Sequence, residues 1–345
     1  MPVLYVTEPG ATVRLSGESL LVTVEEHHEE AHGAGRRKTL LEVESHRLEL
    51  ISIVGAGHIT STAMQHCLER GISVAWLTRS GEFLGRTIGA MPRSAEIRLR
   101  QYAATSNVGT RLERAVSVVN AKLRNAHAVL LDIQSNDSGN DTLRQALTEV
   151  KRIAEHTDSC KEIKSLLGSE GSGARAYFAA FGAAFKSEIP FRGRKHRPAP
   201  DPANSLLSFG YVILGARLAG LLEARGLDPY LGFFHELRPG RPSLALDLLE
   251  ELRHPIVDRF VLRNCNLRVF RPEHFDPPDE DGAVRMNREG LRVFFSHWEN
   301  HLLKPLREHG QEERISPHDL IRRQVERFAA SLGGGELYRP FLYGN

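Results

Sequence analysis

Residues 1–93 are dominated by short hydrophobic stretches that are rich in β-branched residues and separated by turn sequences. Pro-Gly, Gly-Glu and Gly-Ala-Gly stand between these stretches, as expected for strands joined by tight turns. One segment, residues 60–70, has helical spacing instead. The pattern predicts strands at 3–6, 12–15, 19–24, 39–44, 48–54, 72–78 and 83–88.

From Ser94 onward, hydrophobic residues recur with the spacing of amphipathic helices, and hardly any β pattern remains. This change predicts an α+β fold: a small N-terminal β-sandwich-like domain over 1–93, followed by a larger all-α domain over 94–345. Helices are predicted at 95–106, 110–133, 141–156, 173–186, 204–225, 243–253, 256–264, 287–303 and 316–331.

Length and composition are those of an ordinary folded protein with two domains. The chain has 345 residues, 41% of them hydrophobic and 26% charged. Lys and Arg exceed Asp and Glu by only two, so a surface that binds nucleic acid must be local. Cys67, Cys160 and Cys265 are scattered, which argues against a disulfide scaffold or a cysteine zinc site and fits a reducing compartment.

The ends and apolar stretches of the sequence indicate a soluble, cytoplasmic protein without membrane contact. The first residues lack a charged segment followed by an apolar one, so no secretory signal is visible. No apolar run approaches the roughly 18–20 residues that a membrane-spanning helix needs.

Two motifs suggest chemistry that their surroundings do not favour. His28 and His32 form an HEEAH sequence, but its flanks carry no apolar helix face, so a solvated hairpin tip is the better interpretation, and adventitious nickel or zinc binding the alternative. Residues 55–60 (GAGHIT) resemble a dinucleotide-binding turn, yet Thr60 stands at the third glycine position. A tight turn with Thr60 or Ser61 capping the next helix is therefore expected.

Glu170 and His235 each lie in an unusually apolar segment. Glu170 is expected at the start of an Ala-rich helix, with Arg175 as the one obvious charged neighbour. A favourable interaction with the helix dipole would explain Glu170 without any catalytic role. His235 follows two phenylalanines directly, and a histidine in such company is often a hydrogen-bonded core residue.

Asp247 and Glu250 are spaced to share one helix face in a segment otherwise made of leucine and alanine. Two carboxylates on an apolar face are costly unless a positive group lies near them, and exposure of that face to solvent is the alternative. Together with Glu170 and His235 they form a donor set suited to Mg²⁺ or Mn²⁺, because a structural zinc site would need more Cys or His.

Basic residues lie in the same part of the sequence and suggest an anionic substrate, with phosphodiesters the leading candidate. The segment 190–202 is proline-bounded and basic, and it separates Glu170 from His235. The alternative is a solvated surface loop, because most runs of charged residues lie in such loops. The candidate DNA-binding residues are Arg192, Arg194, Lys195, Arg197, Arg238 and Arg241.

Four ordered motifs resemble the CRISPR-associated integrase and endonuclease family, the catalytic subunit of the complex that acquires new spacers. Residues 167–171 (LGSEG) with ARAY at 174–177 resemble its first catalytic motif. Residues 201–211 (DPANSLLSFGY) resemble its central D-P-x-N-x-L-L-S-x-x-Y segment. Residues 232–235 (GFFH) and 243–250 (SLALDLLE) resemble its second and third metal-ligand motifs. Departures from the family pattern are the His-rich insertion at 26–38 and MPR at 91–93.

This resemblance implies a site and a mechanism. Glu170, His235 and Glu250 would hold Mg²⁺ or Mn²⁺, with Asp247 beside them as a supporting or alternative ligand. The expected reaction is attack of a DNA 3′-OH on a phosphodiester, which inserts spacer precursors into a CRISPR array, with hydrolysis as a side reaction. The basic loop at 192–197 would brace the DNA backbone.

The resemblance also implies partners. These are double-stranded DNA, a second copy of the chain, with 1–93 the expected dimerisation domain, and a small ferredoxin-like subunit that completes a heterohexamer. Two other functions stay open: a metal-dependent nuclease or phosphodiesterase outside CRISPR adaptation, and a non-catalytic DNA-binding scaffold. A nicotinamide oxidoreductase is a distant third.

Overall fold

The structure is a computed structural model, and it describes residues 3–26, 36–79, 81–90, 95–135, 140–195, 198–334 and 337–344. His28, His32 and Arg197 lie outside these residues, so the expectations for the HEEAH segment and for Arg197 stay predictions. The chain divides into two compact units. The first contains Met1–Met91 and Asn287–Phe295, and the second Pro92–Met286 and Ser296–Asn345.

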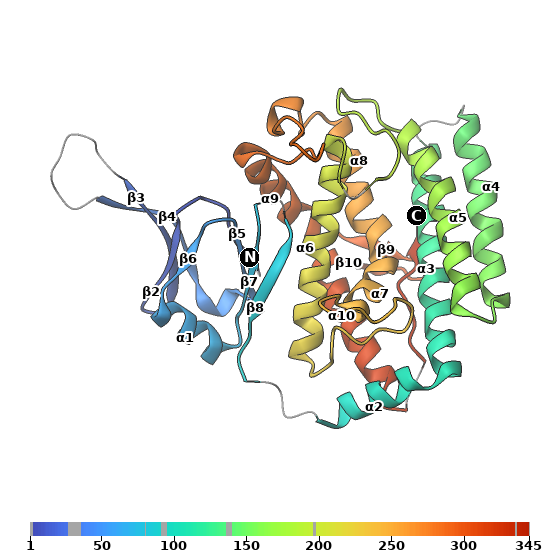
Figure 1. Ribbon diagram of the computed structural model, residues 1–345, viewed down its shortest axis with the longest axis horizontal. Helices are drawn as coiled ribbons and strands as arrows, with labels where there is room; N and C mark the ends of the chain where they lie inside the picture. The colour runs from blue at the N-terminus through green and yellow to red at the C-terminus, as the bar shows by residue number, and fades with distance from the viewer. Residues whose placement is uncertain are drawn as a thin grey trace. The chain divides into compact units, whose positions relative to one another are not determined.

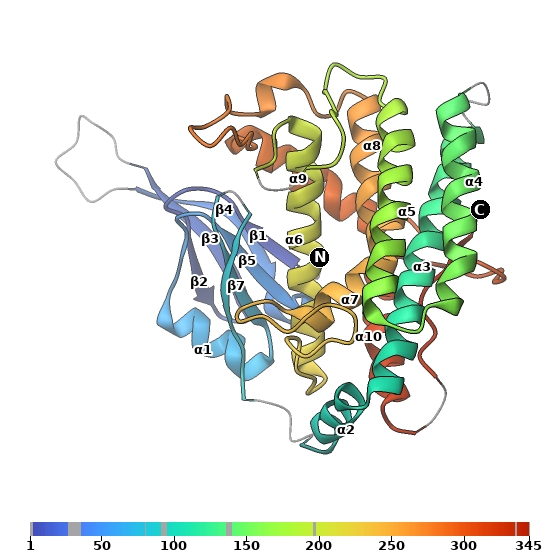
Figure 2. The same ribbon diagram turned by 45° about the vertical axis from the view of Figure 1, so that its right-hand side comes forward.

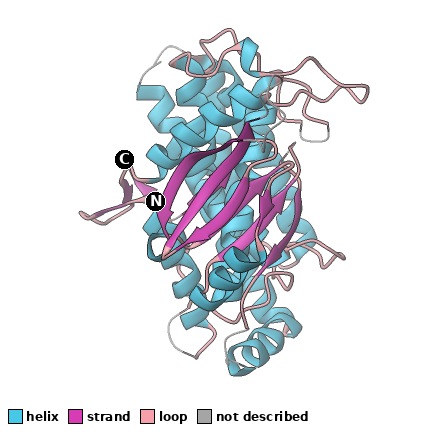
Figure 3. Ribbon diagram, turned by 90° about the vertical axis from the view of Figure 1, so that its left-hand side faces the viewer, coloured by secondary structure: helices cyan, strands magenta, loops and turns pink. Residues whose placement is uncertain are grey.

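The first unit contains two four-stranded sheets, with the strand orders β1-β5-β7-β8 and β4-β3-β2-β6 (Figure 1, Figure 3). Strands β1, β5 and β7 pair in parallel and β8 joins antiparallel, while β2, β3 and β4 are antiparallel neighbours. Residues from both sheets, such as Val13 and Ile51, bury one common core. The strands are β1 (Val3–Val6), β2 (Thr12–Ser16), β3 (Ser19–Glu26), β4 (Arg36–Glu44), β5 (Leu50–Val54), β6 (His58–Ile59), β7 (Ser73–Leu77) and β8 (Phe83–Thr87).

The GAGHIT segment forms a turn, a short strand and a helix start. A Cβ at Gly57 would lie 2.7 Å from Ile53 Cγ2, so the second glycine is required for close packing. The Thr60 hydroxyl accepts from Ala63 N and caps α1 (Ser61–Arg70), as expected. Strand β6, which the sequence did not predict, pairs with β2 in this segment. The glycines thus have a structural reason that needs no nucleotide.

The segment Asn287–Phe295 belongs to the first unit, although the sequence predicted one domain over 94–345. Phe295 stacks on Tyr5 with ring centroids 4.1 Å apart, and Arg288 forms an ion pair with Glu8. These side chains come from α9 (Arg288–Leu302) and from the first strand and the turn after it. Hydrophobic periodicity predicts that a helix exists but not which core its apolar face joins.

The second unit is mainly helical, and its helices α3, α4 and α5 pack against one another (Figure 1, Figure 2). Helix α3 also contacts α7, so it lies between the two helices that carry Glu170 and Glu250. The α-helices of this unit other than α9 are α2 (Ala95–Ser106), α3 (Val108–Ser135), α4 (Asp141–His156), α5 (Ile163–Ala183), α6 (Pro202–Ala224), α7 (Ser243–Leu252), α8 (Arg259–Asn266) and α10 (Pro317–Ser331). It also has the single 3₁₀ turns η2 (Thr157–Ser159) and η4 (Pro272–His274) and the π-helix η3 (Arg253–Asp258). The first unit has one 3₁₀ turn among the described residues, η1 (Ser45–Arg47).

Helix α5 corrects one sequence prediction that matters for the site. It begins at Ile163 and not at residue 173, so Glu170 lies inside the helix and not at its start. The early part of the helix contains three glycines, of which Gly173 is needed for packing, because a Cβ there would overlap the Leu123 side chain of α3. Tertiary packing thus overrides the low helix propensity of glycine, and the helix-dipole explanation of Glu170 loses its basis.

Helix α6 is long and apolar enough to cross a membrane by length and composition, with a mean hydropathy of 1.6, contrary to the expectation from the sequence. However, 72% of its most apolar window is buried inside the protein. It contacts α7 and α10, and its side chains, among them Leu206 and Leu218, are part of the core. A helix that is hydrophobic on all sides is also typical of the centre of a large soluble domain.

The second unit is not all-α, because it contains a small sheet of order β10-β9-β11. Strand β9 (Leu306–Glu308) pairs antiparallel with β10 (Arg314–Ile315) and with β11 (Tyr343–Gly344). These strands are two or three residues long, too short to show an alternating pattern. Their pairing joins the C-terminal tail to the chain ahead of α10.

Candidate active site

Glu170 of α5 and Lys122 of α3 form a buried ion pair. The Lys122 side chain is 3% exposed and that of Glu170 is 22% exposed. Lys122 shares a helix face with Val118, Val119 and Ala126, all of which are buried. An ammonium group on such a face is costly unless it is paired, and Glu170 is one of its partners.

Glu250 of α7 lies on the other side of the same ammonium group. Its Oε2 is 2.5 Å from Lys122 Nζ and 2.9 Å from Arg253 Nη1. Burial disfavours the charged carboxylate, but the positive charges of Arg253 and Lys122 outweigh burial and hold the pKa of Glu250 below its usual range. Asp247 and Glu250 are both buried, so the interpretation of a solvated helix face is wrong.

Asp247 fixes the position of His235. Its Oδ2 accepts hydrogen bonds from Phe233 N at 2.6 Å and Phe234 N at 3.0 Å, and its Oδ1 accepts from His235 N at 3.0 Å. Oδ1 also accepts from His235 Nδ1 at 2.7 Å, which leaves Nε2 facing Glu250, 3.9 Å from its Oε1. Gly232 permits this arrangement, since a Cβ there would lie 2.6 Å from Asp247 Oδ2.

The structure therefore brings together the three predicted metal ligands, Glu170, His235 and Glu250, from α5, a loop and α7. Their chemistry fits a divalent cation: two carboxylates, and an imidazole whose other nitrogen is held by a carboxylate. In the structure the Lys122 ammonium contacts both glutamates. As they are placed, no three His, Cys, Asp or Glu side chains of the described residues are arranged to hold a metal.

A second layer of polar groups surrounds Arg253 in η3. Its guanidinium lies over the Tyr211 ring, 4.2 Å from the centroid. The Tyr211 hydroxyl donates to Asp258 Oδ1 at 2.5 Å, and His254 Nδ1 lies 2.6 Å from Asp258 Oδ2. Burial lowers the pKa of His254 although Asp258 opposes this, and the pKa of Asp258 is held below its usual value despite burial, chiefly by His254.

The basic segment is connected to this layer through Arg194. Its guanidinium lies 5.3 Å from the centroid of Tyr211, the ring that Arg253 also contacts. Arg194 donates to Asn204 Oδ1 at 2.8 Å, and Asn204 N is bound by Asp201, both from the DPxN motif. Arg194 therefore points inward, and its link to Glu250 is indirect, through the Tyr211 ring and Arg253.

The other candidate DNA-binding residues differ in exposure. Arg192 and Lys195 are exposed, and Arg238 is exposed and paired with Glu236 at 3.2 Å. Arg241 is half-buried in the loop that leads into α7. Exposed cations can reach a phosphate, whereas Arg194 must first give up its contacts.

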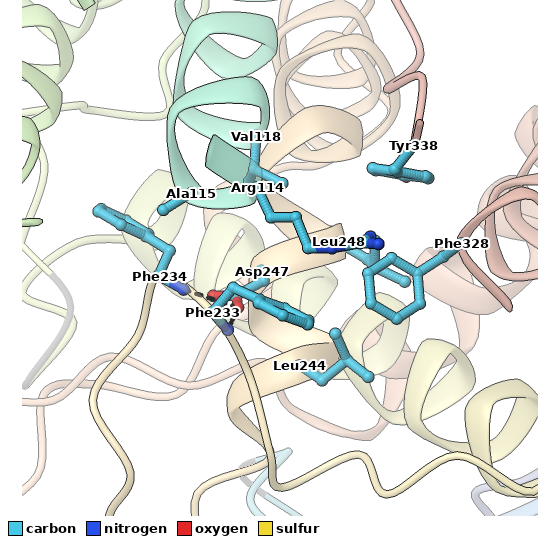
Figure 4. Close-up of a pocket in the computed structure, with 10 residues that line it drawn as sticks. All are labelled: Arg114, Ala115, Val118, Phe233, Phe234, Leu244, Asp247, Leu248, Phe328 and Tyr338. Atoms are coloured by element: carbon cyan, nitrogen blue, oxygen red, sulfur yellow. Dashed lines mark hydrogen bonds between the residues drawn. The ribbon is translucent and has the colours of Figure 1, made fainter. Parts of the chain in front are cut away.

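A small cavity lies beside Asp247, the residue that holds His235, and residues of α3 and α10 contribute to its lining (Figure 4). Its volume is about 10 Å³, roughly one water molecule, so it is too small for a nucleotide. Arg114 lies over the rings of Phe233 and Phe328, 5.2 and 5.5 Å from their centroids. The cavity therefore belongs to the packing behind Asp247 and is not a substrate site.

Comparison with known proteins identifies the family. The family model described as CRISPR associated protein Cas1 matches residues 4–300. The chain is 33% identical over 341 residues to CRISPR-associated endonuclease Cas1 3 of Thermus thermophilus, covering 98% of this chain and 96% of the relative. The chain belongs to the Cas1 family. A second Cas1 endonuclease, from Rhodospirillum rubrum, is 33% identical over 353 residues, which are 99% of this chain and 98% of that protein.

Solved structures share the Cas1 fold. A casposase bound to an integration product superimposes with a TM-score of 0.80 at 24% identity and covers 98% of this chain and 92% of its own. A Cas1 protein from Thermotoga maritima gives 0.79 at 22% identity, with coverage of 98% and 99%. At this identity the likeness establishes the α+β fold alone.

Sequence reasoning missed Lys122, although a signal was present within this Cas1 chain. The helix over 110–133 was predicted, and Lys122 lies three and four residues from Val119 and Val118 on its apolar face. A lysine at such a position requires a buried partner. The identity of that partner is not local information, because Glu170 and Glu250 come from other helices.

Proposed function

We propose that this Cas1 chain is a divalent-metal-dependent DNA endonuclease and integrase that inserts short segments of foreign DNA as new spacers into a CRISPR array. The relatives at 33% identity are named CRISPR-associated endonucleases. The observation that carries the proposal is the convergence of Glu170, His235 and Glu250 from three separate segments on one buried point. A glutamate that only stabilises the fold needs a hydrogen-bond partner, but it does not need a second carboxylate and an imidazole beside it.

Each residue of the site has a defined task in this proposal. Glu170 and Glu250 supply the carboxylate oxygens, and His235 supplies Nε2, since Asp247 occupies its Nδ1. Asp247 positions the imidazole and the backbone around it, because both of its oxygens already accept hydrogen bonds. Arg253 holds Glu250 charged. Asp247 is therefore a positioning residue and not an alternative ligand.

The bound Mg²⁺ or Mn²⁺ would supply a Lewis acid for a phosphodiester and its attacking 3′-OH. The proposed substrate is double-stranded DNA, both as spacer precursor and as CRISPR array. Arg192, Lys195, Arg238 and Arg241 are proposed to contact its phosphates. We also propose a homodimer in the cytoplasm, bridged by a small ferredoxin-like subunit into a heterohexamer. One solved neighbour is a chain of a Cas6-RT-Cas1–Cas2 complex, and the match covers 99% of this chain and 36% of that chain.

A plasmid-integration assay tests the proposal. Purified protein with its partner subunit is incubated with a 3′-OH duplex and supercoiled plasmid, with Mn²⁺ or with EDTA. Covalent joining of the duplex to the plasmid, dependent on Mn²⁺ and absent in Glu170→Ala, supports an integrase. Mn²⁺-dependent nicking without joining would instead indicate a hydrolytic nuclease outside CRISPR adaptation. DNA binding with neither product, under all metal conditions, would indicate a non-catalytic scaffold.

A further inference from the structure

Lys122 places its ammonium group between two of the proposed ligands, Glu170 and Glu250. Its ammonium contacts Glu170 Oε1 and lies 2.5 Å from Glu250 Oε2, and its side chain is almost fully buried. Lys122 comes from α3, whereas the two carboxylates come from α5 and α7, so one side chain joins three helices. An ammonium group can donate three hydrogen bonds, and two of them are directed at these carboxylates.

The charges of the four closest groups balance without a metal. Glu170 and Glu250 carry two negative charges, and Lys122 and Arg253 carry two positive charges that contact them. Asp247 is engaged with His235 and the backbone around it. Each of the two carboxylates therefore has a cationic partner, and a divalent cation would have to compete with Lys122 for both of them.

A metal ion and the ammonium also need the same space. Lys122 contacts Glu170 Oε1 and Glu250 Oε2, so a cation held by these two carboxylates would need oxygens that the ammonium now occupies. Repulsion between positive charges at short separation is strong even under the effective dielectric of a protein. The ammonium and a divalent cation therefore compete for the two carboxylates.

We propose that Lys122 is an internal competitor of the metal: it neutralises Glu170 and Glu250 in the metal-free protein and must release them before a divalent cation binds. This inference rests on the metal site of the proposed function. Lys122 thus stabilises the metal-free fold, because removal of one partner from a buried ion pair leaves charge uncompensated. The same contacts weaken the affinity for metal. Lys122 is a positioning residue that acts through the two glutamates.

Metal titration of full-length variants tests the proposal. MnCl₂ is titrated calorimetrically into wild type, Lys122→Met and Glu170→Ala at constant pH and ionic strength, and melting temperatures are measured with and without Mn²⁺. We expect Lys122→Met to bind Mn²⁺ about tenfold or more tightly than wild type, because the variant has no unit charge beside the ion. Its melting temperature without metal should fall, and Mn²⁺ should raise it further than that of wild type.

Asn125→Ala is the matched control, because Asn125 is buried on the same helix but binds the backbone of Glu251 and Phe341. It should lower the melting temperature and leave Mn²⁺ affinity unchanged, which separates general destabilisation from the effect of charge. If Lys122→Met does not fold, Lys122→Gln removes the charge and keeps an N–H donor, and the same gain in affinity is expected.

The outcomes that overturn the two proposals are distinct. If wild type binds Mn²⁺ in a Glu170-dependent way and neither Lys122 variant binds more tightly, competition by Lys122 is wrong and the metal site stands. If Asn125→Ala increases the affinity for Mn²⁺ as much as Lys122→Met does, the increase results from general destabilisation of the fold. In that case, too, the proposed competition by Lys122 is wrong. If wild type and the Lys122 variants bind no Mn²⁺ that depends on Glu170, the metal site itself is wrong, and the inference falls with it.

Discussion

Glu250 and Glu251 are adjacent on α7, and both are buried, yet their surroundings are opposite in kind. Glu250 faces Lys122 and Arg253, and its pKa is held below the usual range. Glu251 faces neutral donors: the Tyr338 hydroxyl, Phe341 N and, at 3.2 Å, Gln324 Nε2. Burial raises the pKa of Glu251 to about 7, although these hydrogen bonds oppose the rise.

The difference shows that burial alone does not decide what a carboxylate does. The cationic neighbours Lys122 and Arg253 keep Glu250 charged. A charged carboxylate is the form that can bind a metal ion, provided that a neighbouring side chain releases it. Neutral neighbours make Glu251 an anchor for the C-terminal tail, because Phe341 and Tyr338 belong to that tail. One helix turn thus carries a proposed metal ligand, Glu250, and beside it a residue that holds the C-terminal tail, Glu251.

The largest expected effect comes from removing a ligand on the cationic side. Glu250→Ala, Glu170→Ala and His235→Ala should each reduce Mn²⁺-dependent cleavage and integration by a factor on the order of 10³ or more, because each is proposed to supply a different ligand. Activity assays with circular dichroism measure this. Glu236→Ala is the control, since Glu236 follows His235 directly but is exposed. Full activity in any ligand variant would remove that residue from the site.

Asp247→Asn should have a smaller effect on metal binding. Asparagine keeps the shape but offers one accepting oxygen in place of two, so part of the support of His235 and Phe233 disappears. We expect Mn²⁺ affinity to fall about 10- to 100-fold, as is usual when the group that orients a metal-binding histidine is changed. Calorimetry measures this, and a metal affinity equal to that of wild type would contradict the positioning role.

Glu251→Ala should reduce stability and not metal affinity. The change leaves the donors of Tyr338, Gln324 and Phe341 without their buried acceptor. We expect a decrease of about 2–4 kcal/mol in the free energy of unfolding, the cost of several unsatisfied buried groups. Urea denaturation gives this value. A variant of unchanged stability would show that the tail does not depend on Glu251.

The pH dependence of stability sharpens the comparison further. The unfolded chain loses the Glu251 proton near the ordinary pKa of 4.5, while the folded protein retains it up to about 7. The folded state binds more protons in this interval, so the contribution of Glu251 to stability is full below pH 4.5 and declines as pH rises to about 7. The decline is on the order of 3 kcal/mol.

Denaturation of wild type and Glu251→Gln across that pH range measures the decline. Glutamine cannot titrate, so the difference between the two curves should change between pH 4.5 and 7 and be flat above. Parallel curves over the whole interval would contradict the raised pKa.

The smallest effect concerns exposed cations, whose charge water already solvates. Arg192→Ala with Lys195→Ala should weaken DNA binding for all sequences alike and flatten the slope of log affinity against log salt by about 0.9 for each phosphate that the variant no longer binds. Fluorescence anisotropy at several salt concentrations gives the slope. Arg194→Ala is the half-buried counterpart and should lower stability, since Arg194 contacts Asn204 and Tyr211. An unchanged slope in the double variant would exclude both residues from the DNA path.

Local signals predicted much of the secondary structure. Helix α4 has the predicted limits, because its strong amphipathic pattern begins at the Asn140 cap. The predicted start of α5 was wrong: the helix begins at Ile163 and not at residue 173, and Gly173 within it packs against Leu123 of α3. The strands of the β10-β9-β11 sheet are too short to show a pattern.

The residues of the candidate site that lie within sequence motifs could be predicted from the sequence. Glu170, His235 and Glu250 were identified from their apolar surroundings and the family resemblance, and the structure brings them together. Lys122 was not identified, because a partner from another helix leaves no mark in the motif sequence. The inward direction of Arg194 was missed for the same reason, since it depends on Asn204 and Tyr211 of α6.

The most direct test compares Glu250→Gln with Glu251→Gln in one Mn²⁺ titration. The two changes are chemically identical, adjacent in the sequence and both buried, so they differ chiefly in the neighbours of the side chain. We predict that Glu250→Gln loses Mn²⁺ binding, while Glu251→Gln binds Mn²⁺ with the affinity of wild type. Loss of binding in both variants, or in neither, would contradict the assignment of the metal to the cationic side of α7.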